Sequence, residues 1–255
     1  MSRKRIDVLL VERGFFDSRA KARAAVEAGL VRADGSPLRR PSDLAEEDAD
    51  IEAAAAHRWV GRGGLKLDHA LTLWPAPVAG RVVLDLGAST GGFTQVCLER
   101  GAARVFAVDV GRGQLHPSLA ADPRVTDLQG VDARSLTPAL INPPPDLIVC
   151  DLSFIGLAKA LAAPLALAAP GADLITLVKP QFEVGRAAVG KGGIVKDEAA
   201  REVAVDAVCG FLAGEGWTVR GRADSPVEGG DGNREYLVWA AQAEPRRLPD
   251  PGGAG

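Results

Sequence analysis

Apolar and polar residues follow two different patterns along the chain, one before and one after a short alanine-rich stretch. In the first part, helical spacing of apolar residues predicts two short helices over residues 5–13 and 18–28, with Ser18 as the cap of the second. Residues 30–32 then read as a strand that enters an Asp-Gly turn, and residues 49–53 as another strand. The first part is therefore expected to be a small module of helices and short strands.

After residue 62 the pattern changes to a regular alternation of apolar strands and amphipathic helices. Strands are expected at 82–86, 104–108, 125–128, 146–150, 173–178, 217–222 and 235–240. Helices are expected at 63–74, 92–100, 156–168 and 197–214. This alternation predicts an open parallel sheet with helices on both faces. Because no helix separates the last two strands, they should form an antiparallel hairpin at one edge.

These patterns divide the chain into two expected domains. The first is an α+β module over residues 1–56, followed by a linker at 57–62. The second is an α/β domain over residues 63–244, and the Pro/Gly-rich tail at 245–255 is expected to be disordered. A length of 255 residues suits a small domain followed by one of medium size.

Composition excludes several classes of protein. Hydrophobic residues make up 47% and charged residues 25%, as in globular proteins that bury a core. The longest uncharged stretch, residues 160–172, is too short to span a bilayer and contains two prolines. We see no secretory signal. The cysteines are odd in number and widely spaced, which predicts neither disulfides nor a metal site and favours a reducing cytoplasm. They are Cys97, Cys150 and Cys209.

Charge is distributed unevenly, although the net charge is only -3. Residues 1–40 hold ten Lys or Arg against five Asp or Glu, whereas residues 41–56 hold six acidic residues and no basic one. Such local asymmetry says more about partners than the total charge does. It favours a nucleic-acid partner for the N-terminal module, although any single charge could simply face solvent.

The segment SRAKARAAVEAGLVRADG, with its two helices and strand hairpin, resembles the RNA-binding module first described in a small-subunit ribosomal protein. The resemblance implies that basic side chains of this module face RNA phosphates. They are Arg3, Lys4, Arg5, Arg19, Lys21 and Arg23.

A glycine-rich loop follows the first strand of the second domain. Gly87, Gly91 and Gly92 allow a tight turn and a close approach of the backbone to a ligand. Asp109 ends the next strand, where its carboxylate can accept both hydroxyls of a ribose. A dinucleotide-binding domain has similar geometry, but its fingerprint places a glycine where this chain has Ser89. A turn required only by the sheet is the other alternative.

The loop LDLGASTGGFT, together with the aspartate after the second strand, resembles the S-adenosylmethionine motif of class I methyltransferases. This resemblance implies S-adenosyl-L-methionine as the cofactor, with Asp132 as a candidate acceptor for its adenine amino group. The cofactor-binding residues that it implies are Asp85, Gly87, Ala88, Ser89, Gly91, Gly92, Phe93, Asp109, Asp132 and Asp151.

Four charged residues stand at the ends of predicted strands or just before the sheet. Lys66 precedes the first strand, Asp151 and Lys179 end the fourth and fifth, and Glu235 starts the last. Ligands of open α/β sheets bind beyond the carboxyl ends of the strands, so Asp151 and Lys179 should point into the cofactor crevice. Each of them alone could instead form an ion pair that seals a strand end.

Together the four resemble the Lys-Asp-Lys-Glu tetrad of FtsJ-class ribose 2'-O-methyltransferases. With the N-terminal module, residues 3–241 resemble the hemolysin A (TlyA) family of ribosomal RNA methyltransferases, through the segments RGGLKL, DLSF, VKPQFE, GGIVKDE and NREYL. The resemblance implies methylation of a ribose, cytidine in this family, in ribosomal RNA or a ribosomal subunit. Lys179 would be the base, Asp151 and Glu235 would orient the two lysines, and no metal is needed.

The residues that other methylation reactions require are missing from the expected positions of this sequence. Methylation of a base amine uses an Asn/Asp-Pro-Pro-aromatic loop after the fourth strand, where this chain has DLSF, and its NPPP at 142–145 comes before that strand. Methylation of a ring carbon uses a cysteine that usually follows proline, whereas Cys150 follows Val149. A membrane-lytic or purely RNA-binding protein with a non-catalytic domain is the alternative of another class. The intact loop and tetrad favour an enzyme, and the pattern leaves oligomeric state open.

Overall fold

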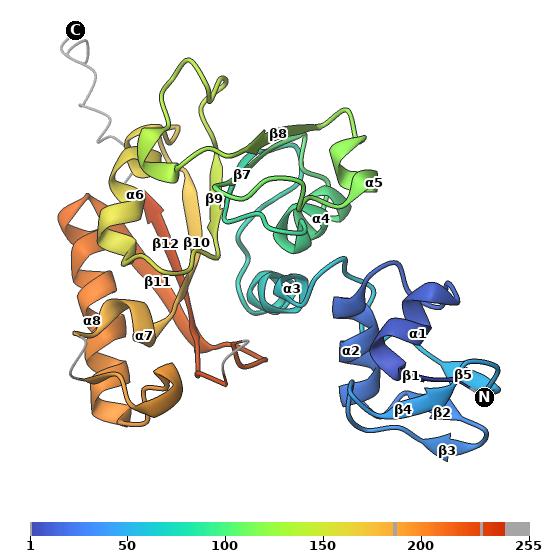
Figure 1. Ribbon diagram of the computed structural model, residues 1–255. Coiled ribbons are helices and arrows are strands. Elements are labelled where there is room, and N and C mark those ends of the chain that lie inside the picture. The colour runs from blue at the N-terminus through green and yellow to red at the C-terminus, as the bar shows by residue number, and fades with distance from the viewer. Residues whose placement is uncertain (1, 186–187, 230–231, 243–255) are drawn as a thin grey trace, which may run out of the picture. The chain divides into compact units, whose positions relative to one another are not determined.

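The computed structural model divides into two compact units, residues 1–62 and 63–255 (Figure 1). It describes residues 2–185, 188–229 and 232–242, so the tail predicted to be disordered lies outside the described residues. No helix in these ranges is long and apolar enough to cross a membrane. Within the same ranges, His, Cys, Asp and Glu side chains form no group that could hold a metal ion.

The N-terminal unit packs two helices against short strands. The helices are α1 (Ile6–Glu12) and α2 (Arg19–Glu27), and Ser18 Oγ accepts from the backbone N–H of Lys21 at 3.4 Å to cap α2. Its strands are β1 (Arg3–Arg5), β2 (Val31–Ala33), β3 (Ser36–Pro37), β4 (Leu44–Glu46) and β5 (Ile51–Ala53). β2 and β5 lie where strands were expected, and β2 pairs with β5 and, across the predicted Asp-Gly turn, with β3. The pairing of β1 with β4 was not predicted, and it brings the acidic segment beside the basic N-terminus.

A mixed seven-stranded sheet forms the centre of the second unit, in the order β11-β12-β10-β9-β6-β7-β8 (Figure 1). The strands are β6 (Val82–Leu86), β7 (Arg104–Asp109), β8 (Val125–Gln129), β9 (Leu147–Cys150), β10 (Asp173–Val178), β11 (Trp217–Asp224) and β12 (Tyr236–Gln242). The first five are parallel, and β12 runs antiparallel to both β10 and β11. The predicted open sheet with an antiparallel edge hairpin is confirmed.

Helices cover both faces of this sheet. The longer ones are α3 (Gly63–Leu73), α4 (Gly92–Glu99), α6 (Leu157–Ala166) and α8 (Glu198–Gly214). The short ones, which were not predicted, are α5 (Pro117–Ala120), α7 (Pro180–Glu183) and the 3-10 helices η1 (Ala133–Ser135) and η3 (Lys191–Gly193). α6 and α8 pack over one apolar core that includes Leu84, Phe106 and Ile148. Side chains that alternate with these along the strands point to the opposite face of the sheet, where Asp85 contacts α4.

Candidate active site

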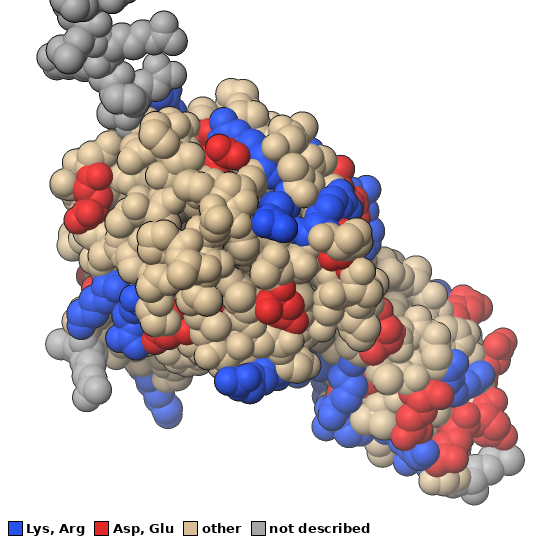
Figure 2. Space-filling view, turned by 90° about the horizontal axis from the view of Figure 1, so that it is seen from above, with Lys and Arg blue, Asp and Glu red and all other residues tan. Residues whose placement is uncertain are grey.

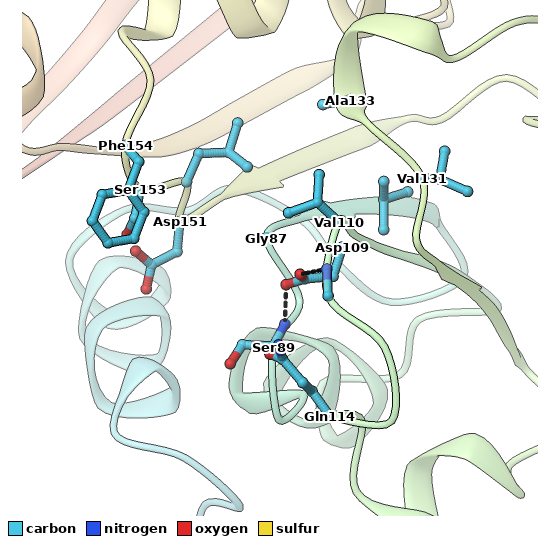
Figure 3. A pocket seen from close by; sticks show the side chains of 13 residues that line it. Gly87, Ser89, Asp109, Val110, Gln114, Val131, Ala133, Asp151, Ser153 and Phe154 are labelled. Atoms are coloured by element: carbon cyan, nitrogen blue, oxygen red, sulfur yellow. Dashed lines mark hydrogen bonds between the residues drawn. The ribbon is translucent and has the colours of Figure 1, made fainter.

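The parallel strands end along one edge of the sheet, and a cavity of about 330 Å³ opens there. This is the size of pocket that holds a small ligand. Figure 3 shows Asp151, Ser153 and Phe154 on one side of it and Asp109 with Gln114 across from them. Its lining is Gly87, Ser89, Val108, Asp109, Val110, Gly111, Gln114, Val131, Ala133, Asp151, Leu152, Ser153 and Phe154.

Gly87 lines the floor of this cavity, at a position that no larger residue fits. Its φ is +82°, in the left-handed region, and a Cβ would lie 2.6 Å from the backbone oxygen of Asp151. The Gly87 N–H donates to the backbone oxygen of Val108 at 2.9 Å, which ties the loop to β7. The backbone of the loop can therefore approach a ligand closely between β6 and β9.

The Asp109 carboxylate lies at the cavity edge with both of its oxygens held in place. It accepts from the Ser89 N–H at 2.8 Å and from the Gly111 N–H at 2.7 Å (Figure 3). A carboxylate oxygen has two lone pairs, so each oxygen retains capacity for one further donor. Two fixed acceptors at a strand end suit the paired hydroxyls of a ribose.

Apolar side chains form the neighbouring wall. Val110, Val131, Ala133 and Leu152 line it, and Val110 is exposed to solvent over 71% of its surface. An exposed valine beside a ribose-type carboxylate can pack against a planar base. The glycine floor, the carboxylate and this wall together fit the methionine, ribose and adenine portions of S-adenosylmethionine.

The four charged residues predicted from the sequence meet beside this cavity. Lys66 Nζ lies 2.5 Å from Glu235 Oε2 and 3.7 Å from Asp151 Oδ2. Lys179 Nζ lies 2.6 Å from Asp151 Oδ1. The sequence predicted that the four would gather, and the structure adds which of them are in contact: Asp151 pairs with both lysines, and Glu235 pairs with Lys66.

All four side chains of this cluster are buried or nearly so. Lys66, Lys179 and Glu235 are each exposed over less than a tenth of their surface, and the side chain of Asp151 over 18%. Removing one partner from such a buried group leaves an uncompensated charge, which is costly. Two cations and two anions balance here. Lys179 also donates to Ser153 Oγ at 2.8 Å, so the serine directs its ammonium group.

Glu235 is held by the chain that precedes β12. The Asn233 amide is almost fully buried; its oxygen accepts from the Val195 N–H at 3.0 Å and its nitrogen donates to the Gly193 backbone oxygen at 3.0 Å. Arg201 of α8 donates to the Tyr236 hydroxyl at 3.1 Å. These bonds attach the residues before Glu235 to the GGIVKDE stretch and the residue after it to α8.

Several residues predicted to bind the cofactor do not line the cavity. Gly91 and Gly92 lie where the loop enters α4, and Phe93 is buried behind them. A Cβ at Gly91 would collide with the side chain of Leu119 and lie 2.8 Å from that of Leu115. In this structure Gly91 is thus needed for packing between the loop and residues 115–119, while its contact with a cofactor stays a prediction, as does that of Ala88.

The two other aspartates predicted to contact the cofactor have structural partners. Asp85 is fully buried in β6 and accepts a hydrogen bond from Thr94 Oγ1 at 2.6 Å, and burial raises its pKa to about 7. Asp132 caps η1 through the Arg134 N–H and pairs with the Arg134 side chain at 2.6 Å. These hydrogen bonds to Arg134 lower the pKa of Asp132 to about 2. Asp132 lines a second cavity rather than the first.

The second cavity, of about 630 Å³, adjoins the first and shares residues with it, among them Ser153 and Phe154. Phe154 is exposed over 89% of its surface, has a φ of +67°, and lies 5.2 Å from the Phe182 ring, measured between centroids. The sequence analysis predicted no role for Ser153 or Phe154 of the DLSF segment. A signal was available, because the two residues lie two and three positions after a predicted catalytic aspartate, Asp151.

The NPPP segment lies away from both cavities. It precedes β9, and the backbone oxygen of Asn142 accepts from Arg104 at the start of β7 at 3.3 Å. It therefore stands at the amino ends of the strands, opposite the glycine loop. A loop that positions a base amine for methylation would have to lie at the carboxyl ends of the strands, beside the glycine loop.

The basic residues predicted to contact RNA are all in the N-terminal unit, and all form ion pairs within it. Arg3 and Lys4 pair with acidic residues of the 41–56 segment, and Lys21 and Arg23 pair within the α2 region. Arg5 and Arg19 share one partner, Asp7. Figure 2 shows acidic and basic side chains mixed on the visible face of this unit.

Comparisons with known proteins cover both units. The FtsJ-like methyltransferase family matches residues 59–242, and the S4 domain family matches residues 4–51. The chain is 46% identical to "16S/23S rRNA (cytidine-2'-O)-methyltransferase TlyA" of Mycobacterium tuberculosis, over 96% of this chain and 92% of that one. It is 40% identical to "Putative rRNA methyltransferase YqxC" of Bacillus subtilis, over 97% and 90%. The solved structure of a putative hemolysin from Streptococcus thermophilus aligns with a TM-score of 0.76 and 36% identity, covering 96% and 90%.

Proposed function

The chain belongs to the TlyA family of ribosomal RNA methyltransferases, with an S4 and an FtsJ-like domain, and we propose that it methylates the ribose 2'-hydroxyl of a cytidine in ribosomal RNA. The observation that carries this proposal is the buried cluster Lys66, Asp151, Lys179 and Glu235 beside a cavity that fits S-adenosylmethionine. It offers an amine next to a reacting centre and no nucleophile for attack on a base.

The cofactor supplies an electrophilic methyl group on a sulfonium. The protein then has to hold a hydroxyl in line with that methyl and remove its proton. We assign proton removal to Lys179, whose Nζ donates to Ser153, a residue that lines both cavities. When Lys179 is neutral, Asp151 still has a cation near it, the ammonium of Lys66 at 3.7 Å.

Glu235 and Asp151 orient the two lysines in this scheme. Glu235 contacts Lys66 at 2.5 Å, so Lys66 keeps this partner when Lys179 changes its charge. Asp109 and the valine wall hold the nucleoside part of the cofactor, and Gly87 allows the close approach. The exposed ring of Phe154 is placed to cover one face of a nucleotide base.

Substrate capture is assigned to the N-terminal unit, through its exposed lysines and arginines. Several of these side chains are more than half exposed despite their ion pairs, as in Arg3, Arg19 and Arg23. Phosphate contacts by such groups release counterions, so binding should weaken steeply with salt. A ribosomal substrate places the reaction in the cytoplasm.

The test of the proposed function is the position of the methyl group. Ribosomal subunits are incubated with the enzyme and labelled S-adenosylmethionine, and the extracted RNA is hydrolysed in alkali. A 2'-O-methyl blocks attack on the adjacent phosphodiester, so the label should appear in an alkali-resistant dinucleotide that contains cytidine. Label found only in mononucleotides would mean base methylation and would overturn the proposal.

A further inference from the structure

Asp7 is a fully buried carboxylate that lies between two exposed arginines of the N-terminal unit. Its side chain has no solvent exposure, whereas those of Arg5 and Arg19 are exposed over 49% and 58%. Arg5 ends β1 and Arg19 begins α2, so the two come from different elements and meet only at this carboxylate. A buried charge is tolerated only when its partners are well placed.

The geometry leaves most of the guanidinium donors available. Arg5 donates from Nε and Nη2 to the two oxygens of Asp7, at 3.0 and 3.1 Å, and Arg19 donates from Nη2 at 2.7 Å. A guanidinium carries five N–H groups, so two of Arg5 and one of Arg19 are used. These bonds lower the pKa of Asp7 to about 2, and the carboxylate stays ionised at neutral pH. The three groups together carry one positive charge.

The other predicted RNA-binding cations are arranged differently. Lys4 pairs with Glu12 at 2.8 Å, and Lys21 with Asp17 at 2.8 Å. Both of these carboxylates are exposed over more than 40% of their side chains. A bound phosphate could therefore displace them at low cost, whereas Asp7 is enclosed and cannot leave its arginines.

We propose that Asp7 is a positioning residue that holds Arg5 and Arg19 side by side as one preorganised fork for a phosphate of the RNA backbone. This inference rests on the proposed RNA substrate. Arginine recognises phosphate through parallel N–H donors whose direction matters, so fixing two guanidinium groups before binding removes an entropic cost. The fork binds backbone rather than bases, and it therefore contributes affinity without sequence preference.

Positioning by Asp7 predicts a change in RNA affinity opposite in sign to the change that charge alone would cause. Asp7→Asn removes a negative charge beside two predicted RNA contacts, which by charge alone should tighten RNA binding. We expect binding of the full-length chain to a fluorescently labelled RNA stem-loop to weaken about tenfold instead, as the fork loses its alignment. Glu12→Gln is the matched control: it also removes one acid beside a cation, but an exposed one, and should leave binding unchanged or tighter.

A second pair of variants separates positioning from folding. Arg5→Lys with Arg19→Lys keeps both charges and the buried carboxylate but removes the fork, because an ammonium is a point charge. Binding should weaken about tenfold with an unchanged salt slope. Adding Asp7→Asn to this double variant should weaken RNA binding little further. If Asp7 had only a structural role, the added substitution would weaken binding by the same factor as it does alone. Thermal unfolding identifies any variant that has not folded.

The outcomes also distinguish this inference from the function on which it depends. Weakened binding by Arg5→Ala with Arg19→Ala, together with unchanged or tighter binding by Asp7→Asn, would overturn the positioning role alone. Unchanged binding by both would overturn the fork and the assignment of RNA capture to these arginines. Cytidine methylation of ribosomal subunits, measured with the same proteins, tests the proposed function separately.

Discussion

The Lys66 ammonium and the Glu235 carboxylate meet at 2.5 Å although 169 positions separate them in the sequence. Lys66 belongs to α3, which precedes the sheet, and Glu235 directly precedes β12, the last strand along the chain. The charge cluster is therefore complete only after β12 has inserted between β10 and β11. Formation of the site and completion of the sheet are coupled through this pair.

This coupling predicts a stability effect. Glu235→Leu should lower the free energy of unfolding by about 3 kcal/mol, at the low end for a broken buried pair, because Asp151 remains 3.7 Å from Lys66. The double variant with Lys66→Met should recover at least half of this loss, since no charge is left alone. Urea unfolding followed by circular dichroism measures both. Equal losses in the single and double variants would refute the coupling.

Long apolar elements could be predicted from the sequence because their pattern repeats. The expected bounds of 82–86 and 173–178 are those of β6 and β10. β1 and β4 were missed because three-residue strands such as Arg3–Arg5 contain no alternation to detect. Their pairing depends on contacts between residues about forty positions apart, which no local pattern specifies.

In the candidate site, too, some features follow from a local pattern and others depend on long-range packing. Charged residues at strand ends must share one edge of a parallel sheet, so the gathering of Asp151 and Lys179 could be predicted. Which lysine contacts which carboxylate depends on where α3 packs, and the sequence does not specify that. Contact of Gly91 with the cofactor stays a prediction, and its packing against the side chains of Leu115 and Leu119 could not be predicted from the local pattern.

Lys179→Ala should abolish methyl transfer while leaving cofactor affinity within about twofold. Removing a general base typically lowers the rate about 100-fold or more, and Lys179 does not line the cofactor cavity. Single-turnover transfer and calorimetry with S-adenosylmethionine measure the two effects. Ser153→Ala keeps the amine and removes only its hydrogen bond, so it should cost less. Transfer at the wild-type rate by Lys179→Ala would exclude Lys179 as the base.

Gly91→Ala should weaken cofactor binding by about tenfold or more, through an indirect effect. The new Cβ would displace Leu115 and Leu119, and with them the segment that carries Gln114 into the cavity. Gly113→Ala is the matched control, because Gly113 also has a positive φ, of +65°, but nothing lies within 4 Å of a Cβ there. Equal effects of the two substitutions would mean that backbone strain, rather than the collision, is responsible.

The buried Asp85 should make the stability of the enzyme depend on pH. Its ordinary pKa is 3.8, and burial beneath the glycine loop raises the pKa to about 7, against the opposing hydrogen bond from Thr94. Between these two values the folded chain keeps a proton at Asp85 that the unfolded chain has lost. The stabilisation from this group is therefore complete below about pH 4 and decreases as pH rises toward 7.

The expected slope over that interval is about 1.4 kcal/mol per pH unit, the value for one proton. Other groups titrate in the same range, so the measured quantity is the difference in unfolding free energy between wild type and Asp85→Asn. That difference should fall with pH between about 4 and 7 and then become constant. Thr94→Val removes the hydrogen bond that lowers the pKa of Asp85, and it should extend the decline to higher pH. A difference that stays constant from pH 4 to 8 would show that Asp85 is ionised throughout.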